Sequence, residues 1–149
     1  YLAGFYLQKQ QTSQAIAEYQ QIINATPNHV MALNNLAALL EEQNDPAAFG
    51  YAQRAYGLQP TNPVVMDTYG WSLLQQGKTP EATPLLKQAA RAMPETPSVQ
   101  YHWAVALAKS GQSAQAQALL QKLLASSQRF DERDKASILL KTIQSSSNH

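Results

Sequence analysis

The sequence contains no cysteine, few charged residues and no long apolar run. The absence of cysteine excludes disulfides, thiolate nucleophiles and cysteine-based metal sites. Only 14% of the residues are charged, and eleven basic residues nearly balance ten acidic ones, which leaves a net charge of +1. This balance gives no basic surface for nucleic acid or an anionic membrane. No apolar run approaches the roughly eighteen residues that a membrane-spanning helix needs.

Alanine and glutamine are abundant and take the place of the missing charges. Both are good helix formers, because alanine loses no side-chain entropy in a helix and glutamine loses little. The composition therefore favours an all-α fold. The absence of cysteine fits the cytoplasm and the periplasm equally well.

Small residues recur along the chain at a nearly constant spacing, which indicates internal repeats. One series consists of Ala15, Ala48, Ala82 and Ala116, and each of its first three members is followed at the same distance by a proline, at Pro27, Pro60 and Pro94. A second series consists of Ala3, Ala37, Gly70 and Ala104. Each member of this second series follows a bulky residue, the four being Leu2, Leu36, Tyr69 and Trp103. Small side chains at these places would let two antiparallel helices approach closely.

With these spacings the chain resembles the tetratricopeptide repeat family. The resemblance implies a right-handed α-solenoid of about four helix pairs and a C-terminal capping helix. We expect a single domain over residues 1–144, with repeats at about 1–29, 30–62, 63–96 and 97–130, a capping helix at 131–144 and a tail at 145–149. The expected helices of the repeats are 1–10, 13–25, 29–43, 46–58, 63–76, 80–93, 97–109 and 113–127.

Local signals set several of these boundaries. Asn44-Asp45-Pro46 is interpreted as a helix stop, an N-cap and a first-turn proline, and similar starts occur at Asn62-Pro63, Thr79-Pro80 and Thr96-Pro97. Gly77 and Gly111 are expected to end the preceding helices. Repeat length implies that the first pair lacks about five residues, so we expect Tyr1 to begin inside a helix of a longer chain. In the capping helix, charges at 131–135 precede apolar residues expected to face the last repeat: Ile138, Leu139, Leu140 and Ile143.

The first helix of each pair predicts a binding surface. Positions about one step off the core stripe should face the concave side of the solenoid, which such arrays use for binding. This groove is predicted to carry Met31, Asn34, Asn35, Ala38, Val64, Asp67, Thr68, Trp71, Tyr101, His102 and Val105. Such a mixture of apolar and polar side chains suits a protein or peptide ligand.

Individual groove residues have competing interpretations. Trp71 either anchors a ligand or packs between repeats, whereas Trp103 belongs to the bulky core series. Asn34 and Asn35 either hydrogen-bond an extended peptide or form solvated surface, and the same alternatives hold for Asp67 and His102. The predicted groove contains no lysine or arginine, which argues against the clamp with which some tetratricopeptide domains grip a C-terminal carboxylate.

Residues for catalysis are not arranged in any recognisable pattern. The three histidines, His29, His102 and His149, lie in different repeats or the tail, and no HExxH pair, phosphate loop or G-x-S-x-G elbow occurs. Glu41 and Glu42 are adjacent on one helix and point about 100° apart. We therefore expect no enzyme activity, no cofactor and no metal site.

A closer resemblance lies in three stretches: LNNLAALLEE (33–42), DTYGWSLLQQGK (67–78) and YHWAVALAKSGQ (101–112). They are similar to the C-terminal repeats of the tetratricopeptide lipoprotein of the PEP-CTERM/exosortase system, a bacterial family linked to exopolysaccharide production. This resemblance implies an extracytoplasmic location, in the periplasm or at the outer membrane. The leading hypothesis is a protein-interaction scaffold. The alternatives are a regulatory or substrate-presenting arm of a larger enzyme, and self-association through Leu2, Phe5 and Tyr6 of the open first repeat.

Overall fold

The chain folds into helices connected by short loops. The computed structural model describes the backbone of residues 2–147 and the side chains of residues 8–146, and within that part of the chain all regular structure is helical. The chain divides into two compact units, Tyr1–Ser72 and Leu73–His149, called here the first and the second unit. The all-α prediction is confirmed.

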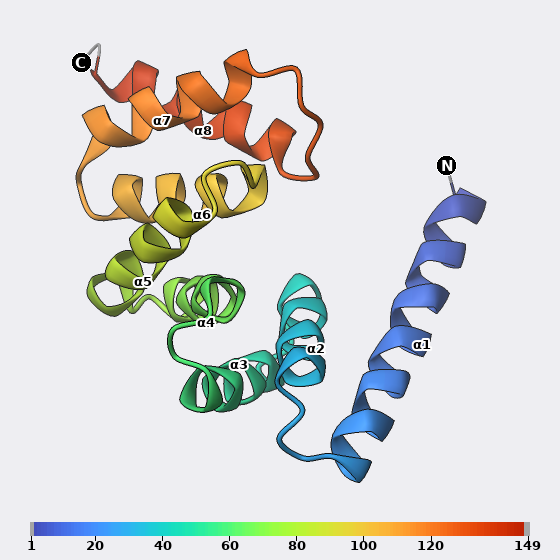
Figure 1. The fold of residues 1–149 in the computed structure, drawn as a ribbon. Coiled ribbons are helices and arrows are strands. Elements are labelled where there is room, and N and C mark those ends of the chain that lie inside the picture. The colour runs from blue at the N-terminus through green and yellow to red at the C-terminus, as the bar shows by residue number, and fades with distance from the viewer. Residues whose placement is uncertain (1, 148–149) are drawn as a thin grey trace. The chain divides into compact units, whose positions relative to one another are not determined.

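The helices follow one another as α1 (Leu2–Ala25), α2 (Val30–Glu42), α3 (Ala47–Leu58), α4 (Pro63–Gln75), α5 (Thr79–Ala92), α6 (Pro97–Lys109), α7 (Ser113–Ala125) and α8 (Arg133–Ser147) (Figure 1). The first unit holds α1 to α3 and most of α4, and the second unit holds the end of α4 and α5 to α8. Helices α2 to α8 begin and end close to their predicted bounds.

The predicted first helix pair was wrong, because α1 is one helix of 24 residues. The expected turn near residues 11–12 has neither glycine nor proline to break the helix. Its hydroxyls also bond backward along the helix: Thr12 Oγ1 donates to the Gln8 carbonyl at 3.0 Å and Ser13 Oγ donates to the Lys9 carbonyl at 3.2 Å. At the start of a helix these hydroxyls would instead cap the free backbone amides. Here they are hydrogen-bonded inside a continuous helix. The side chains of Leu2, Phe5 and Tyr6, on which the self-association hypothesis rests, lie outside those described.

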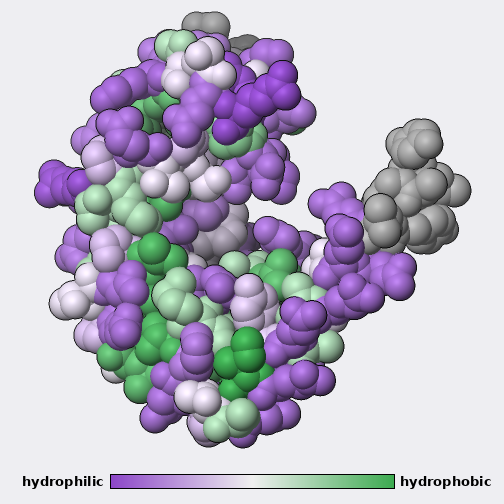
Figure 2. Space-filling view, turned by 45° about the vertical axis from the view of Figure 1, so that its right-hand side comes forward, coloured by the Kyte–Doolittle hydropathy of each residue, from purple (hydrophilic) through white to green (hydrophobic). Residues whose placement is uncertain are grey.

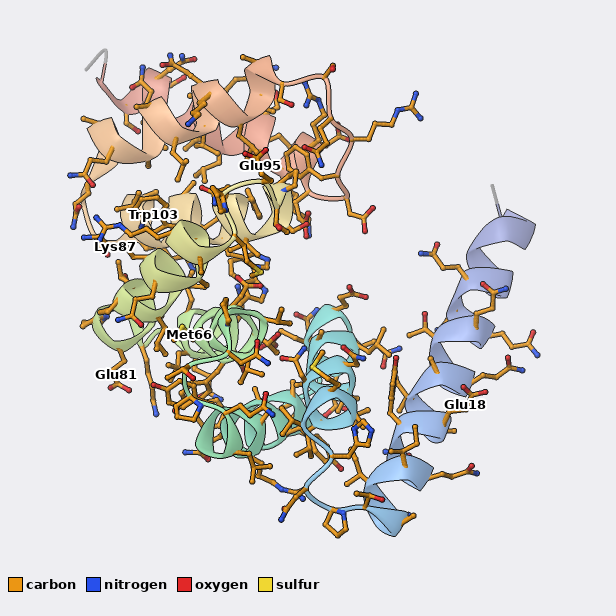
Figure 3. All side chains as sticks on the ribbon, in the orientation of Figure 1. Glu18, Met66, Glu81, Lys87, Glu95 and Trp103 are labelled. Atoms are coloured by element: carbon orange, nitrogen blue, oxygen red, sulfur yellow. The ribbon has the colours of Figure 1, made fainter. Side chains whose placement is uncertain are left out.

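The core of the first unit is built on the leucine stripe of α2, where Leu33, Leu36 and Leu40 are at most 5% exposed. These leucines pack with Ile23 of α1, Val65 of α4 and the small residues Ala48 and Ala55 of α3. Glu18, on the opposite face of α1, points away from α2 (Figure 3). The α1 residues Ile16, Tyr19 and Ile23 therefore form the face that covers α2, at the i, i+3 and i+7 spacing of an amphipathic helix.

Aromatic rings join α4 to α3 in the first unit. The Tyr56 and Tyr69 rings stack with their centroids 4.8 Å apart, and the Phe49 ring lies 5.8 Å from that of Tyr69. Such pairs add about 0.5–1.5 kcal/mol beyond the apolar area they bury. Tyr69 thus has the packing role expected of the bulky residue in its repeat.

The predicted small residues lie where helices meet. Buried members of the two series include Ala37, Ala48, Ala82, Ala104 and Ala116, each at most 1% exposed. Helix α5 packs against α6, α6 against α7, and α7 against α8, so these alanines lie within the helix contacts of the second unit as well. The packing reason given for the repeat is therefore confirmed.

The capping helix α8 buries Ala136 and Ile143 and half-buries Leu139 and Leu140. Ile138, predicted to face the last repeat, is 64% exposed. At 100° per residue it lies about 200° around the helix from Ala136, on the opposite side. That one assignment was wrong, and the rest of the capping face is as predicted.

The helix boundaries depend on a few capping residues. Asp45 Oδ1 accepts a hydrogen bond from the Ala47 amide at 2.9 Å, and Asn62 Oδ1 accepts one from Val64 at 3.0 Å, as predicted. Gly77 and Gly111 each have φ of +80°, the left-handed conformation that ends a helix. The threonine caps were wrong: Thr79 is already the first residue of α5, and Thr96, although at the N-cap position of α6, makes no side-chain capping bond.

Candidate partner-binding surface

The predicted binding residues of α2 share one side of that helix. Met31, Asn34 and Ala38 follow the i, i+3 and i+7 spacing that places side chains in one row. Met31 is 41% exposed and Ala38 is exposed, whereas Asn34 between them is only 3% exposed. In this row, two accessible apolar side chains flank a buried polar one.

Asn34 is unusual because its carbonyl oxygen, Oδ1, is buried and has no hydrogen-bond partner. Leaving a buried acceptor unsatisfied costs about 1–3 kcal/mol, and most buried polar atoms in proteins are paired. The helix carries this cost beside Met31, on a face that is otherwise open to solvent.

Asn35, the next residue, has a different role. Its Nδ2 donates to the Tyr19 hydroxyl of α1 over 3.4 Å, a long bond that crosses between the two helices. This amide therefore links α2 to α1. Of the two asparagines, Asn34 is the one whose side-chain oxygen is buried without a hydrogen-bond partner.

The predicted residues of α4 belong to the same unit as those of α2. Val64 is 38% exposed and lies one repeat after Met31, so the two residues occupy equivalent places in the first turns of α2 and α4. Asp67 and Trp71 are half-buried. Thr68 is also half-buried, and its hydroxyl donates to the Val64 carbonyl at 3.1 Å within the helix. We call Met31, Asn34, Ala38, Val64, Asp67 and Trp71 the α2–α4 face. Figure 2 shows hydrophobic surface (green) interspersed with hydrophilic surface (purple) on the side of the molecule that it presents.

The predicted residues of α6 lie in the second unit and are more enclosed. Tyr101 is 7% and Val105 9% exposed, and His102 is half-buried. The Tyr101 and His102 rings have their centroids 6.1 Å apart. Burial, and then the nearby negative charge of Glu132, raise the pKa of Tyr101 above its ordinary value, because both disfavour the phenolate.

Two residues at this end of α6 were missing from the prediction. Ser98 Oγ donates to Glu132 Oε2 at 2.8 Å, which ties the residue just before α8 to the first turn of α6. Ser98 could have been found, because it lies one repeat after Val64 and so occupies the same place in its own helix pair. Glu132 could not, since it belongs to the connection into the capping helix and has no equivalent in the repeats.

Within the described residues, no group of three or more histidine, cysteine, aspartate or glutamate side chains could hold a metal ion. The described part of the chain also contains no helix of the length and apolarity needed to cross a membrane.

Comparison with known families gives the same result in both units. Two family models, each described as tetratricopeptide repeat, match residues 6–63 and residues 73–136. None of the curated proteins matches the chain significantly.

Solved structures resemble the chain over most of its length. A structure of PilF from Pseudomonas aeruginosa has a TM-score of 0.72 at 21% identity and matches 99% of this chain and 66% of its own. YrrB, described as a tetratricopeptide protein with an unusual peptide-binding site, has a TM-score of 0.66 at 18% identity over 87% of this chain and 66% of its own. PilW, a type IV pilus biogenesis factor, has a TM-score of 0.70 at 23% identity over 94% of this chain and 67% of its own. The chain thus spans about two thirds of these structures and has the same solenoid fold.

Proposed function

The chain belongs to the tetratricopeptide repeat family, a class of protein-interaction scaffold, and we propose that its first unit binds an extended peptide segment on the α2–α4 face. The observation that carries this proposal is the buried, unpartnered Oδ1 of Asn34 beneath an accessible apolar row. We propose that the Asn34 side chain turns toward the surface on binding, where a backbone N–H of the peptide supplies the missing hydrogen bond.

The apolar side chains of this face suit the rest of such a peptide. Met31 and Val64 present accessible apolar surface at equivalent places on two helices of the same unit. Methionine adapts its shape to different partners because its side chain is unbranched and flexible. Asp67 and Trp71 add a charge and a large aromatic ring to the same face, and tryptophan is enriched among the residues that dominate binding energy. This combination favours a peptide with apolar side chains and free backbone amides.

A substitution at Asn34 separates a binding role from a structural one. Asn34→Leu replaces the buried amide by an apolar group of similar size, which removes the unsatisfied acceptor and should leave stability unchanged or raised. The same change should weaken a peptide bound through that oxygen by about tenfold, which corresponds to roughly 1.4 kcal/mol. If Asn34 served only to pack α2, the substitution could weaken peptide binding only by also lowering the stability of the chain.

Peptides for this test can be selected from a random phage-displayed library panned against the whole chain. Their affinities are then measured through Trp71 emission in a Trp103→Phe background, in which Trp71 is the only tryptophan. Asn24→Leu, at an exposed asparagine of α1, is the matched control and should leave affinity unchanged. Selected peptides that bind the Asn34→Leu chain as tightly as the parent would exclude this face as the binding site.

We also propose that the scaffold works outside the bacterial cytoplasm, as part of a lipoprotein associated with exopolysaccharide or protein sorting. The support is the resemblance in residues 33–42, 67–78 and 101–112, together with the similarity in fold to a pilus biogenesis factor. Fractionation of cells that carry the native gene, probed with antibodies against this chain, tests the location. Recovery in the cytoplasmic fraction would contradict it.

A further inference from the structure

A pocket of about 210 Å³ lies in the second unit, and none of its lining residues belongs to the predicted groove. Its lining comes from the loop before α6 and the first turns of that helix, from the C-terminal half of α7, and from the loop that follows α7. Figure 3 shows one of its residues, Glu95, beside the start of α6. We call this cavity the α6–α7 pocket.

The walls of the α6–α7 pocket are largely apolar. Five of its lining residues are Pro94, Pro97, Leu119, Leu123 and Phe130. A dry cavity of about 150 Å³ lined by leucine, isoleucine and phenylalanine can hold a benzene ring. A volume of 210 Å³ therefore accommodates one aromatic ring with a polar substituent.

A glutamine in the pocket has a defined orientation. Gln100 Nε2 donates to the backbone carbonyls of Ala90 at 2.8 Å and Met93 at 3.1 Å. Because carbonyl oxygens accept hydrogen bonds and do not donate them, these two bonds identify the nitrogen side of the amide. The atom that Gln100 can offer to an occupant of the pocket is therefore Oε1, an acceptor.

The loop that forms one wall is held in place before any ligand arrives. The guanidinium of Arg133, in the first turn of α8, donates to the carbonyls of Leu124 at 2.8 Å, Ser126 at 3.0 Å and Gln128 at 3.3 Å. Ser126 Oγ also accepts a hydrogen bond from the Gln128 amide at 3.2 Å. A wall fixed in this way loses little entropy on binding, which favours a specific contact.

We propose that the α6–α7 pocket receives a single aromatic side chain with a hydrogen-bond donor at its tip, a tyrosine or tryptophan, from a partner protein. The ring would occupy the apolar walls, and its O–H or N–H would bond to Gln100 Oε1. Tyrosine and tryptophan are also the aromatic residues most often found as buried anchors of protein interfaces.

The size and rim of the pocket favour a side chain over a free small molecule. Sites that enclose small ligands usually have volumes of about 300–1,000 Å³, and this pocket is smaller. Its rim consists of exposed polar residues, among them Glu95, Lys122, Ser126 and Gln128. A polypeptide whose side chain enters the pocket would lay its backbone across this polar rim.

The test is a nuclear magnetic resonance titration of the isotope-labelled chain with three probes: N-acetyl-tyrosinamide, N-acetyl-phenylalaninamide and N-acetyl-leucinamide. The proposal expects saturable shifts at the Gln100 side-chain amide and at residues 123–130. It also expects the tyrosine probe to bind about threefold to tenfold more tightly than the phenylalanine probe, because only tyrosine can donate a hydrogen bond. The leucine probe should be weaker still.

Variants on α7 locate the binding. Leu119→Trp places an indole against the pocket and should abolish the tyrosine-induced shifts, whereas Ala118→Trp adds the same group at an exposed position of that helix and should preserve them. Contacts between the probe ring and the Leu119 and Leu123 methyl groups, measured as nuclear Overhauser effects on the unmodified chain, do not depend on the variants folding. Equal affinity for all three probes, shifts elsewhere in the chain, or no saturable shift would each overturn the proposal.

Discussion

Replacing Arg133 by methionine should release the capping helix from the end of α7. The guanidinium contributes three hydrogen bonds to backbone carbonyls around the end of that helix. A hydrogen bond from a charged group contributes about 1.5–3 kcal/mol, and the bond to Leu124 is the one of the three that is partly buried. The bonds to Ser126 and Gln128 are exposed and add less.

From these contacts we expect Arg133→Met to destabilise the attachment of α8 by about 2 kcal/mol. Methionine keeps an apolar stem of similar length, so the loss comes from the hydrogen bonds and from the positive charge near the C-terminus of α7. Arg133→Lys should lose part of this energy, because an ammonium cannot reproduce the planar fork of donors.

Amide hydrogen exchange measures the effect locally, which matters because neighbouring elements of a repeat protein can open separately. A loss of about 2 kcal/mol predicts roughly 30-fold faster exchange for the core amides of α8, while those of α2 stay unchanged. Arg129→Met, an exposed arginine in the same loop, is the control and should alter exchange less than about twofold. Equal exchange in the two variants would refute the assigned role of Arg133.

The remaining predictions concern glycine, a buried tyrosine and helix caps. Gly111→Ala should lower the free energy of unfolding by about 1–2 kcal/mol, because alanine is strained at φ of +80°. Gly50→Ala lies inside α3 with open space around it and should raise that free energy by about 0.5–1 kcal/mol; urea denaturation measures both variants. The raised pKa of Tyr101 means that the folded state holds the phenol proton more tightly than the unfolded state, so the stability of the fold should fall as pH rises above about 10. Thermal unfolding at increasing pH should show a less steep fall for Tyr101→Phe. Asn62→Ala should cost about 1 kcal/mol in urea denaturation, whereas Thr96→Ala should cost less than about 0.5 kcal/mol because its hydroxyl makes no capping bond.

The helices could be predicted because their contacts repeat along the sequence. Ala82, Ala104 and Ala116 are buried at the positions that the repeat spacing assigned to helix contacts. The break in α1 was predicted from the same spacing, and there it failed. A repeat spacing predicts where helices pack, but a helix ends only where local chemistry stops it. Helix α1 continues without a break through Thr12, whose hydroxyl donates to the Gln8 carbonyl.

The candidate sites were less predictable, because they depend on individual side-chain contacts that the repeat spacing does not specify. The position of Asn34 on the binding side of α2 followed from helix geometry, but its unpartnered oxygen depends on the packing around it. The predictions for Trp71 and the other groove residues remain predictions. Arg133 and Gln100 carried no sequence signal, since their partners are backbone carbonyls and any residue supplies a carbonyl.

The low charge of the chain gives the two proposed sites a common character. Each presents an amide oxygen in apolar surroundings, Asn34 Oδ1 on the α2–α4 face and Gln100 Oε1 in the α6–α7 pocket. Interactions between exposed charges weaken as salt screens them, whereas hydrogen bonds between neutral groups and apolar contacts are not screened. The part of the binding that comes from these amide oxygens and from apolar contacts should therefore change little with ionic strength. Contacts to Asp67 on the α2–α4 face, or to Glu95 and Lys122 at the pocket rim, should weaken as salt is added. Each site would discriminate against a ligand that lacks the required hydrogen-bond donor, because such a ligand would leave the amide oxygen unpaired. Neutral sites achieve large differences in affinity between ligands in this way.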